Sequence, residues 1–355
     1  MSPVGLVSLE TAVPPHCIDQ LEAAALARSI FQGRYHDFSR LANVFATSGI
    51  RTRHAVRPLA WFDQVRDWSE RTDAYLEGAK VLFIDAARKA LASAGMTARD
   101  IDTVVTVSST GIAAPTLEAR AFGEMGFRED VRRVPVFGLG CAGGTSGLGI
   151  AARLAAAEPG ARVLLVVVEL CTLAFRLDKP TKSNIVASAL FGDGAAACVL
   201  QSAPDRADRD GGLATIEASG EHLWPDTLDI MGWVVDPQGF DVIFSRAIPP
   251  FAQAHAASAV AAILARSGLS LDDVDRFVLH PGGAKVIAAL ERSLSLDQGT
   301  LQHERAVLSA YGNMSAPTVL FVLKQALKAG LPRRTLLGAM GPGFTMSCIT
   351  LRAAA

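Results

Sequence analysis

The sequence predicts a layered α/β protein in which strands and helices alternate along the chain. Short apolar runs alternate with longer helix-like stretches in both halves. The run at 163–170 is apolar almost throughout, as expected for a strand buried on both faces. Half of the 355 residues are hydrophobic and 19% are charged, which supplies enough apolar surface for a large core. In folds of this class, active sites gather at the carboxyl ends of strands.

The expected elements fall into two groups. In the first half we expect strands at 4–9, 104–107, 134–139, 163–170 and 195–200, and helices at 18–31, 73–94, 117–125 and 145–157. In the second half we expect helices at 249–267, 284–293 and 314–329, and strands at 277–279, 335–339 and 347–351. Residues 202–212 are polar and contain glycine, as is typical of a linker. The chain is therefore expected to divide into halves at 1–210 and 211–355.

Composition excludes several classes of protein. The net charge of −1 gives no general attraction to nucleic acid or to an anionic membrane. The five cysteines are widely spaced and include no CxxC pair, which argues against a disulfide framework or a zinc site and for a reducing compartment. No apolar run reaches about 18 residues, so no membrane span is expected. The N-terminus has no basic segment followed by an apolar one, and we expect a cytoplasmic protein.

Cys141 stands in a glycine-rich turn between an apolar run and a helix-like stretch. A cysteine at such a turn has its sulfur near the positive end of a helix dipole, which favours the nucleophilic thiolate. The neighbouring glycines let the backbone turn sharply and let a substrate approach closely. The alternative is a buried, inert core cysteine, and the turn by itself does not decide between the two.

Two turns in the second half resemble the Cys141 turn. The strand at 277–279 ends at His280, which Pro-Gly-Gly follows, and Asn313 follows Gly312 at the start of a helix. A histidine in such a place also suits a purely structural role, and an asparagine after glycine also suits a turn or cap. Asn313 also begins a glycosylation sequon, which we set aside because nothing in the sequence indicates secretion.

Together, the cysteine, histidine and asparagine form a coherent catalytic set. His280 can hold Cys141 as a thiolate, and the Asn313 amide can join His280 in binding an oxyanion. This set suits attack on a thioester followed by carbon–carbon bond formation, because decarboxylation of a malonyl thioester produces an enolate whose oxygen needs two such donors. A Cys-His-Asn protease uses the same residue types, but the papain-type segment around the cysteine is missing.

Five motifs in order make the chain resemble type III polyketide synthases, the chalcone synthase superfamily of the thiolase fold. They are Gly140-Cys141-Ala-Gly-Gly-Thr, Phe191-Gly-Asp-Gly-Ala-Ala-Ala, His280-Pro-Gly-Gly, Tyr311-Gly-Asn313-Met-Ser and Gly341-Pro342-Gly343-Phe344. The resemblance covers nearly the whole chain. It implies a five-layered αβαβα fold with two pseudo-duplicated halves, a homodimer, and free acyl-CoA and malonyl-CoA as substrates, with no resident cofactor or metal.

The resemblance also implies roles for individual residues. Cys141 is the expected carrier of the starter and of the growing chain, and His280 with Asn313 is the expected decarboxylation pair. Phe191 matches a gatekeeper between the coenzyme A tunnel and the cavity. The loop from Gly341 to Phe344 matches one that shapes the cyclisation cavity. Ser315 matches a residue near the nucleophile, and Ser109 a small polar pocket residue.

Departures from the family pattern concern the cavity. Val242 stands where the family has a second gatekeeper phenylalanine, and Ala114 where plant enzymes place a methionine that reaches across the dimer. Cys171 and Ala174 replace two pocket threonines. Smaller and less polar side chains predict a wider, more apolar cavity, in which a long alkyl chain gains about 0.8 kcal/mol per buried methylene. We therefore expect a medium- or long-chain fatty acyl-CoA starter.

Residues 221–233 are similar to the bacterial alkylresorcinol and alkylpyrone synthases of the family, which implies such a product. Arg34, Arg40, Arg51 and Arg53 form a mildly basic stretch, and Arg34 and Arg40 in particular are candidates for the coenzyme A phosphates. The nearest rival function is the single condensation of a ketoacyl synthase III, on a carrier protein in fatty acid synthesis. That family usually follows its histidine with Gln-Ala-Asn, whereas His280 precedes Pro-Gly-Gly.

Overall fold

The structure, a computed structural model, describes residues 3–203 and 212–354. Nine strands in these residues form one mixed sheet in the order β11-β12-β13-β8-β1-β7-β6-β4-β5. They are β1 (Val4–Ala12), β4 (Thr103–Val107), β5 (Arg132–Val136), β6 (Arg162–Leu170), β7 (Asp193–Ser202), β8 (Ala214–Leu223), β11 (Arg276–Leu279), β12 (Arg334–Gly341) and β13 (Thr345–Ala353). Two small sheets pair β2 (His16–Asp19) with β3 (Thr52–Ala55) and β9 (Met231–Asp236) with β10 (Gly239–Phe244).

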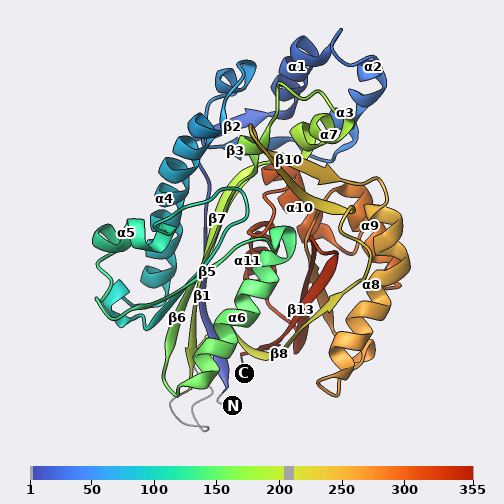
Figure 1. Cartoon of the computed structure of the whole chain (residues 1–355). Coiled ribbons are helices and arrows are strands. Elements are labelled where there is room, and N and C mark those ends of the chain that lie inside the picture. The colour runs from blue at the N-terminus through green and yellow to red at the C-terminus, as the bar shows by residue number, and fades with distance from the viewer. Residues whose placement is uncertain (1–2, 204–211, 355) are drawn as a thin grey trace.

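The helices of the described chain surround this sheet (Figure 1). They are α1 (Gln20–Phe31), α2 (Phe38–Leu41), α3 (Asn43–Thr47), α4 (Trp68–Ser93), α5 (Leu117–Met125), α6 (Gly143–Ala157), α7 (Lys182–Leu190), α8 (Ile248–Ala265), α9 (Ala284–Ser293), α10 (Gln302–Tyr311) and α11 (Thr318–Lys328). Short 3-10 turns include η1 (Leu59–Asp63), η3 (Gly140–Ala142) and η4 (Cys171–Ala174).

The sheet has two halves, one from each half of the chain. β1 and β4 to β7 form the first and β8 with β11 to β13 the second, and the antiparallel pairing of residues 4–6 with 214–216 joins them. α6 and α11 contact strands of both halves, so they lie between them. α4 and α5 cover the first half, and α8 and α9 cover the second (Figure 1). These five layers confirm the expected αβαβα thiolase fold.

Small residues at the start of α6 let the two halves meet closely. A Cβ atom at Gly144 would lie 2.2 Å from the backbone oxygen of Ala316, and one at Gly147 would lie 2.7 Å from Val107. Glycine at these positions therefore allows α6 to lie directly against β4 and against the turn before α11. This approach places the Cys141 turn beside the turn that contains Asn313.

Several predicted boundaries are shifted for local reasons. The helix expected at 18–31 begins at Gln20, because Ile18 pairs in β2 and the Asp19 side chain caps the helix by accepting from Leu21 N–H. The helix expected at 73–94 begins at Trp68, after a capping box at Asp67. The helix expected at 314–329 begins at Thr318, because Ser315 has a φ of 60° and keeps the preceding residues in a turn.

The boundary predicted between residues 210 and 211 lies outside the described residues, as does most of the linker predicted at 202–212, so both stay predictions. Among the residues that the structure describes, α8 is the helix long and apolar enough to cross a membrane by length and composition alone. It packs against α9, β8 and β13 and buries Ala252, Ala256 and Val260. A core helix packs in this way, so α8 is weak support for a membrane span.

Candidate active site

Cys141 lies in the turn η3 between the end of β5 and the start of α6, as the sequence predicts. Its side chain is buried, with 6% exposed. Gly140 before it has a φ of 47°, and a Cβ atom there would lie 2.6 Å from Pro342. Glycine is therefore required for this turn. The turn places the sulfur at the N-terminal end of α6, where the helix dipole favours negative charge.

Asn313 and Ser315 lie in the turn between α10 and α11, against the sulfur. The Asn313 side chain is fixed at both ends: its Oδ1 accepts from Ser315 N–H at 2.8 Å, and its Nδ2 donates to the Gly282 carbonyl at 3.3 Å. Its backbone forms a bridge to Phe191. Burial raises the pKa of the Cys141 thiol, and the neighbouring side chains of Ser315 and Asn313 offset this only in part.

His280 follows β11 directly and is buried, with 5% exposed. Its backbone N–H donates to Gly338, which fixes the turn, whereas neither ring nitrogen has a hydrogen-bond partner within the described chain. The pocket at His280 and the pocket at Cys141 share Met231 and Phe244, so the two side chains face neighbouring parts of one cavity. An imidazole held by its backbone alone leaves both ring nitrogens for a substrate.

Burial dominates the electrostatics of this pair. Burial raises the pKa of Cys141 to about 11 and lowers that of His280 to about 3. Each pKa shift reflects the free-energy cost of burying a single charge. Proton transfer from the thiol to the imidazole instead creates two opposite charges, which attract one another. No hydrogen bond or ion pair between the two side chains is present in residues 3–203 and 212–354, so the expected ion pair stays a prediction.

The structure gathers most of the predicted pocket residues around Cys141. The lining of this pocket includes Ser109, Cys171, Phe191, Val242, Ser315 and Pro342. Gly341 lies against the Cys141 turn, because a Cβ atom there would meet the Leu139 oxygen at 2.6 Å. Phe344 is fully buried at the His280 pocket, and Gly343 before it has a φ of 132°.

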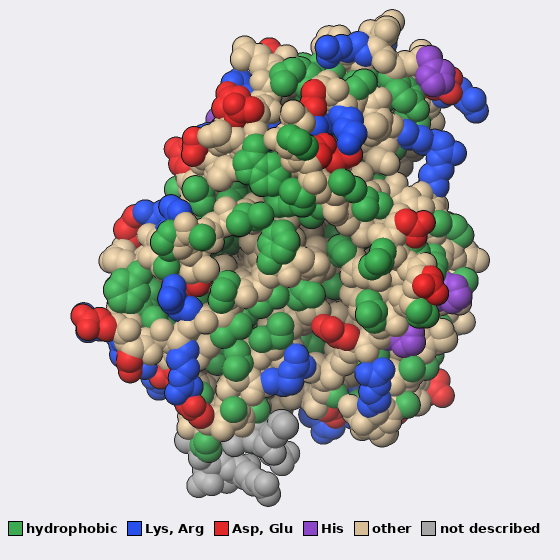
Figure 2. Space-filling view, viewed as in Figure 1, with side chains coloured by type: hydrophobic (Ala, Val, Ile, Leu, Met, Phe, Trp, Pro, Cys, Tyr) green, Lys and Arg blue, Asp and Glu red, His purple; other side chains and the backbone are tan. Residues whose placement is uncertain are grey.

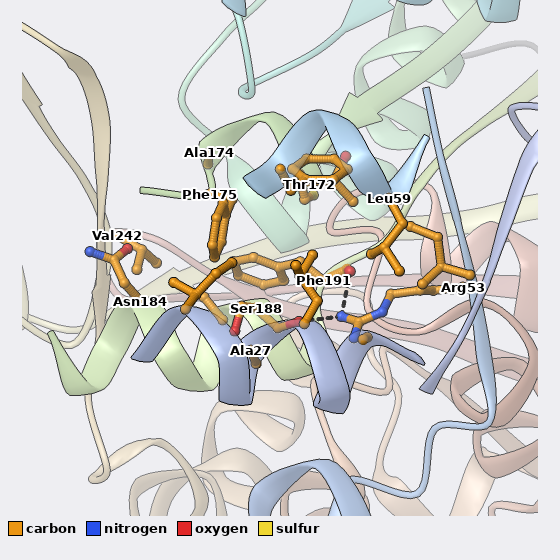
Figure 3. Close-up of a pocket in the computed structure, with 17 residues that line it drawn as sticks. Ala27, Arg53, Leu59, Thr172, Ala174, Phe175, Asn184, Ser188, Phe191 and Val242 are labelled. Atoms are coloured by element: carbon orange, nitrogen blue, oxygen red, sulfur yellow. Dashed lines mark hydrogen bonds between the residues drawn. The ribbon is translucent and has the colours of Figure 1, made fainter. Parts of the chain in front are cut away.

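A second, apolar pocket continues from the first (Figure 3). The two share Cys171, Phe191 and Val242, and the second encloses about 650 Å³, including the part open to solvent. Its walls come from α1, η1, η4 and α7, and include Ile18, Ala23, Leu26, Ala27, Ile30, Leu59, Phe62, Ala174, Phe175 and Ala187. The guanidinium of Arg53 also faces this pocket, but it is engaged by the carbonyls of Ser188 and Phe191 and by Gln20 (Figure 3).

Three predicted residues lie away from these pockets. Ala114 is exposed and does not line the pockets of its own chain around Cys141. Arg34 and Arg40 are exposed near the end of α1 and in α2, close in sequence to the wall of the apolar pocket.

Sequence reasoning missed several residues of the site. Trp233 and Phe244, from the hairpin of β9 and β10, line the Cys141 pocket, and the sequence analysis gave neither of them a role. Glu169 is fully buried beneath it, accepts from Ser109 N–H at 3.0 and 2.9 Å and from Thr110 Oγ1 at 2.7 Å, and has its pKa raised to about 8 by burial. Glu169 could have been found from the sequence, because it is a lone glutamate in the apolar run at 163–170.

Two family models match the chain. The model of the N-terminal domain of chalcone and stilbene synthases matches residues 2–204, and that of the C-terminal domain matches residues 215–355.

Individual relatives match over most of their length. The chain is 38% identical over 350 residues to 1,3,6,8-tetrahydroxynaphthalene synthase of Streptomyces peucetius subsp. caesius, covering 98% of this chain and 92% of that one. It is 31% identical over 350 residues to the alpha-pyrone synthesis polyketide synthase-like Pks18 of Mycobacterium tuberculosis, covering 95% and 88%. The crystal structure of the tetrahydroxynaphthalene synthase of Streptomyces coelicolor A3(2), a bacterial type III polyketide synthase, superposes with a TM-score of 0.91 at 28% identity over 99% of both chains.

Proposed function

The chain belongs to the chalcone and stilbene synthase family and is a type III polyketide synthase, and from this premise we propose that it extends a medium- or long-chain fatty acyl-CoA with malonyl-CoA. The observation that carries the proposal is the apolar pocket that continues from the Cys141 pocket past Phe191 and Val242. The charged group in its lining, the Arg53 guanidinium, is already hydrogen-bonded within the protein, so an acyl chain attached to Cys141 can enter the pocket.

In the first step, the sulfur of Cys141 attacks the carbonyl carbon of the starter thioester. The thiol proton passes to His280, whose unpartnered ring nitrogens can accept it. Coenzyme A leaves as a thiolate and takes that proton. The starter is then a thioester on Cys141, with its alkyl chain in the apolar pocket.

In the second step, malonyl-CoA loses carbon dioxide. The electron pair of the broken carbon–carbon bond forms an enolate, whose oxygen accepts hydrogen bonds from a ring N–H of His280, which is neutral again after coenzyme A has taken its proton, and from the Asn313 amide. The fixed Asn313 side chain is already oriented, since Ser315 N–H and the Gly282 carbonyl hold it. The enolate carbon attacks the Cys141 thioester, the Cys141 thiolate leaves, and the lengthened chain is then a thioester of coenzyme A. The Cys141 thiolate attacks that thioester, coenzyme A leaves, and the chain is again on Cys141 for the next cycle.

The starter preference follows from the walls of the apolar pocket. They are mostly aliphatic or aromatic, and the polar members are already hydrogen-bonded within the protein. Arg53 is engaged by backbone oxygens and by Gln20, Thr172 by Asp193, Asn184 by Asp241, and Ser188 by the Ile185 carbonyl. Each methylene that the pocket buries contributes about 0.8 kcal/mol, which is about a fourfold gain in the specificity constant. An alkyl chain therefore gains more from this pocket than a polar or malonyl starter.

After the last extension the chain cyclises and leaves. Lactonisation gives an alkylpyrone and aldol closure gives an alkylresorcinol or resorcylic acid, and we propose a product of this group. The name of one relative refers to alpha-pyrone synthesis, which supports a pyrone among the products. Neither reaction needs a metal or a resident cofactor, and none is proposed.

We also propose a cytoplasmic homodimer. Several large apolar side chains are exposed on the described chain, among them Ile112, Phe137, Leu228 and Val235. Figure 2 shows apolar side chains spread over the middle of one face, with charged side chains mainly around its margin. Association of two copies through this face would remove it from water.

Mass spectrometry of the products from a panel of acyl-CoA starters with malonyl-CoA tests the proposal. We expect alkylpyrones or alkylresorcinols from starters of medium and long chain. Efficient use of aromatic or malonyl starters, with no product from any fatty acyl-CoA, would falsify it. Equal activity with carrier-bound malonate would instead favour a ketoacyl synthase.

A further inference from the structure

The hairpin of β9 and β10 stands apart from the main sheet and forms one wall of the cavity. It supplies Trp233, Val242 and Phe244 to the pocket at Cys141, and Val242 also lines the apolar pocket. The opposite wall at the junction of the two pockets is η4 and α7, with Cys171 and Ala187. The position of the hairpin relative to η4 and α7 therefore sets the width of this junction.

A buried arginine connects the two walls. Arg176 lies two positions after the end of η4, and only 2% of its side chain is exposed. Its Nε and Nη2 donate to the carboxylate of Asp178 at 2.8 and 2.6 Å, and its Nη1 donates to Asp236 at 3.0 Å. Asp236 is the last residue of β9, so Arg176 holds the outer end of the hairpin.

A second connection lies next to Val242 itself. Lys179 pairs with Asp241 at 2.5 Å, and the amide of Asn184, in α7, donates to the same carboxylate at 3.0 Å. Asp241 precedes Val242 in β10. The residue that lines both pockets is thus adjacent to an anchored carboxylate.

The cluster is balanced in charge. Three cations face three carboxylates: Arg71, Arg176 and Lys179 with Asp178, Asp236 and Asp241. The guanidinium of Arg71 also reaches the Gln238 carbonyl in the hairpin turn at 3.4 Å. Removing Arg176 leaves the partly exposed Asp178 and Asp236 without their main counter-charge, which weakens the attachment of the outer end of the hairpin.

The inner face of the hairpin is held differently. The indole N–H of Trp233 donates to the Ser109 carbonyl at 2.9 Å, and its ring packs against Phe191 and Phe240. These contacts keep the hairpin over Cys141 even when the outer end is released. Loss of the charge cluster is therefore expected to loosen the hairpin at Asp236 and Val242 and to leave the catalytic turns in place.

We propose that the Arg176 cluster, Arg71, Arg176, Lys179, Asp178, Asp236 and Asp241, positions the hairpin and thereby determines how starters of different length are discriminated. Arg176 acts through Asp236 and the hairpin, so it is a positioning residue. The inference rests on the proposed function, because discrimination by length presupposes that the starter chain enters the apolar pocket.

The test compares Arg176→Met with Arg57→Met. Arg57 forms an ion pair with Glu77 at 2.6 Å on the surface, so its loss controls for removal of an ordinary charge pair. Hydrogen exchange of residues 231–244 reports the hairpin directly, without substrate. Specificity constants for dodecanoyl-CoA and butyryl-CoA report the discrimination, and malonyl-CoA decarboxylation without starter reports the catalytic turns.

For Arg176→Met we expect exchange in residues 231–244 to become about tenfold faster or more, since a buried ion pair is lost. The ratio of the two specificity constants changes by about fivefold or more, and decarboxylation stays within about twofold. Arg176→Lys, which keeps one charge, restores part of the ratio. Arg57→Met changes none of these quantities.

Two results overturn the inference: unchanged exchange in residues 231–244, or faster exchange with an unchanged ratio. If the wild-type chain uses no fatty acyl-CoA, the proposed function fails, and the ratio is then taken between the largest and the smallest starter that it accepts. If Arg176→Met does not fold, Asp241→Asn serves in its place, because it removes the Lys179–Asp241 pair and leaves the Lys179–Asp236 pair and both Arg176 pairs intact.

Discussion

The catalytic turns and the apolar pocket are built in opposite ways. Cys141, His280 and Asn313 each lie at a turn next to a strand or helix end, and backbone hydrogen bonds or close glycine contacts fix each turn. The apolar pocket takes its walls from α1, η1, η4, α7 and β10, which are far apart in sequence. The reaction thus depends on three side chains at fixed turns. The choice of starter depends on many pocket residues, each of which contributes a small part of the binding energy.

The largest effect on activity is expected when the nucleophile is removed. Cys141→Ala is expected to lower product formation by about 10³-fold or more and to abolish the acyl-enzyme seen by intact-protein mass spectrometry. Cys198→Ala, at a buried cysteine of β7 outside the pockets around Cys141, is the matched control and should retain activity. An acyl-enzyme that forms on the Cys141→Ala protein would disprove the role of this sulfur.

The pH dependence of Cys141 tests whether the turns act as a unit. With His280 as its charged partner, Cys141 should react with iodoacetamide at a rate that varies little between about pH 6 and pH 9. In His280→Ala the thiolate loses its partner, so the pKa rises toward the value of about 11 that burial gives the thiol. At pH 7 alkylation should then be up to about 10⁴-fold slower and should increase about tenfold per pH unit. Superimposable profiles for the two proteins would rule out the ion pair.

Filling the apolar pocket tests the other side of the comparison. Ala27→Phe places a ring in the pocket from α1, and we expect the ratio of specificity constants for dodecanoyl-CoA over butyryl-CoA to fall by about 10²-fold, equivalent to three or four excluded methylenes. Ala25→Phe, on the exposed face of the same helix, is the control. An equal effect of both variants would mean that the chain lies elsewhere.

Narrowing the junction should have a smaller effect. Val242→Phe adds about four heavy atoms between the two pockets and is expected to lower the specificity constant for long starters by about tenfold, with little change for butyryl-CoA. Val242→Ile should give an intermediate value in the same assay. A uniform loss for all starters would indicate general distortion of the site.

The smallest effect is expected at the exposed arginines. Replacing Arg34 and Arg40 by alanine should raise KM for both CoA substrates by about two- to fivefold at low salt, because exposed charge contacts are weak and screened. The effect should shrink as salt is added. Arg28→Ala, in the last turn of α1, is the control, and an equal change there would remove the special role of the other two.

The sequence predicted the catalytic turns and the α/β class because both have local signals. Cys141 and His280 stand where apolar runs meet glycine-rich turns, and β6 is buried along almost its whole length. The α/β class was therefore predictable from the residues, whereas the five αβαβα layers were implied only by the resemblance to the family. The structure places Cys141, Asn313 and Ser315 at neighbouring turns.

The cavity walls were predicted only in part, because their signals are not local. The sequences of β9 and β10 show no regular alternation of apolar and polar residues, and the burial of their side chains does not alternate regularly either. α7 has only nine residues, and α1 was predicted as a helix without any role in the pocket. Ala27 and Ala187 become neighbours of one cavity only through the tertiary fold.

The central claim is that the apolar pocket receives the starter chain of the Cys141 thioester. Its most direct test is the specificity constant of the wild-type protein for saturated acyl-CoA starters of increasing length at fixed malonyl-CoA. We expect an increase of about two- to fourfold for each added methylene until the pocket is filled, followed by a plateau. A specificity constant that stays flat or falls from the shortest starter onward would contradict the account.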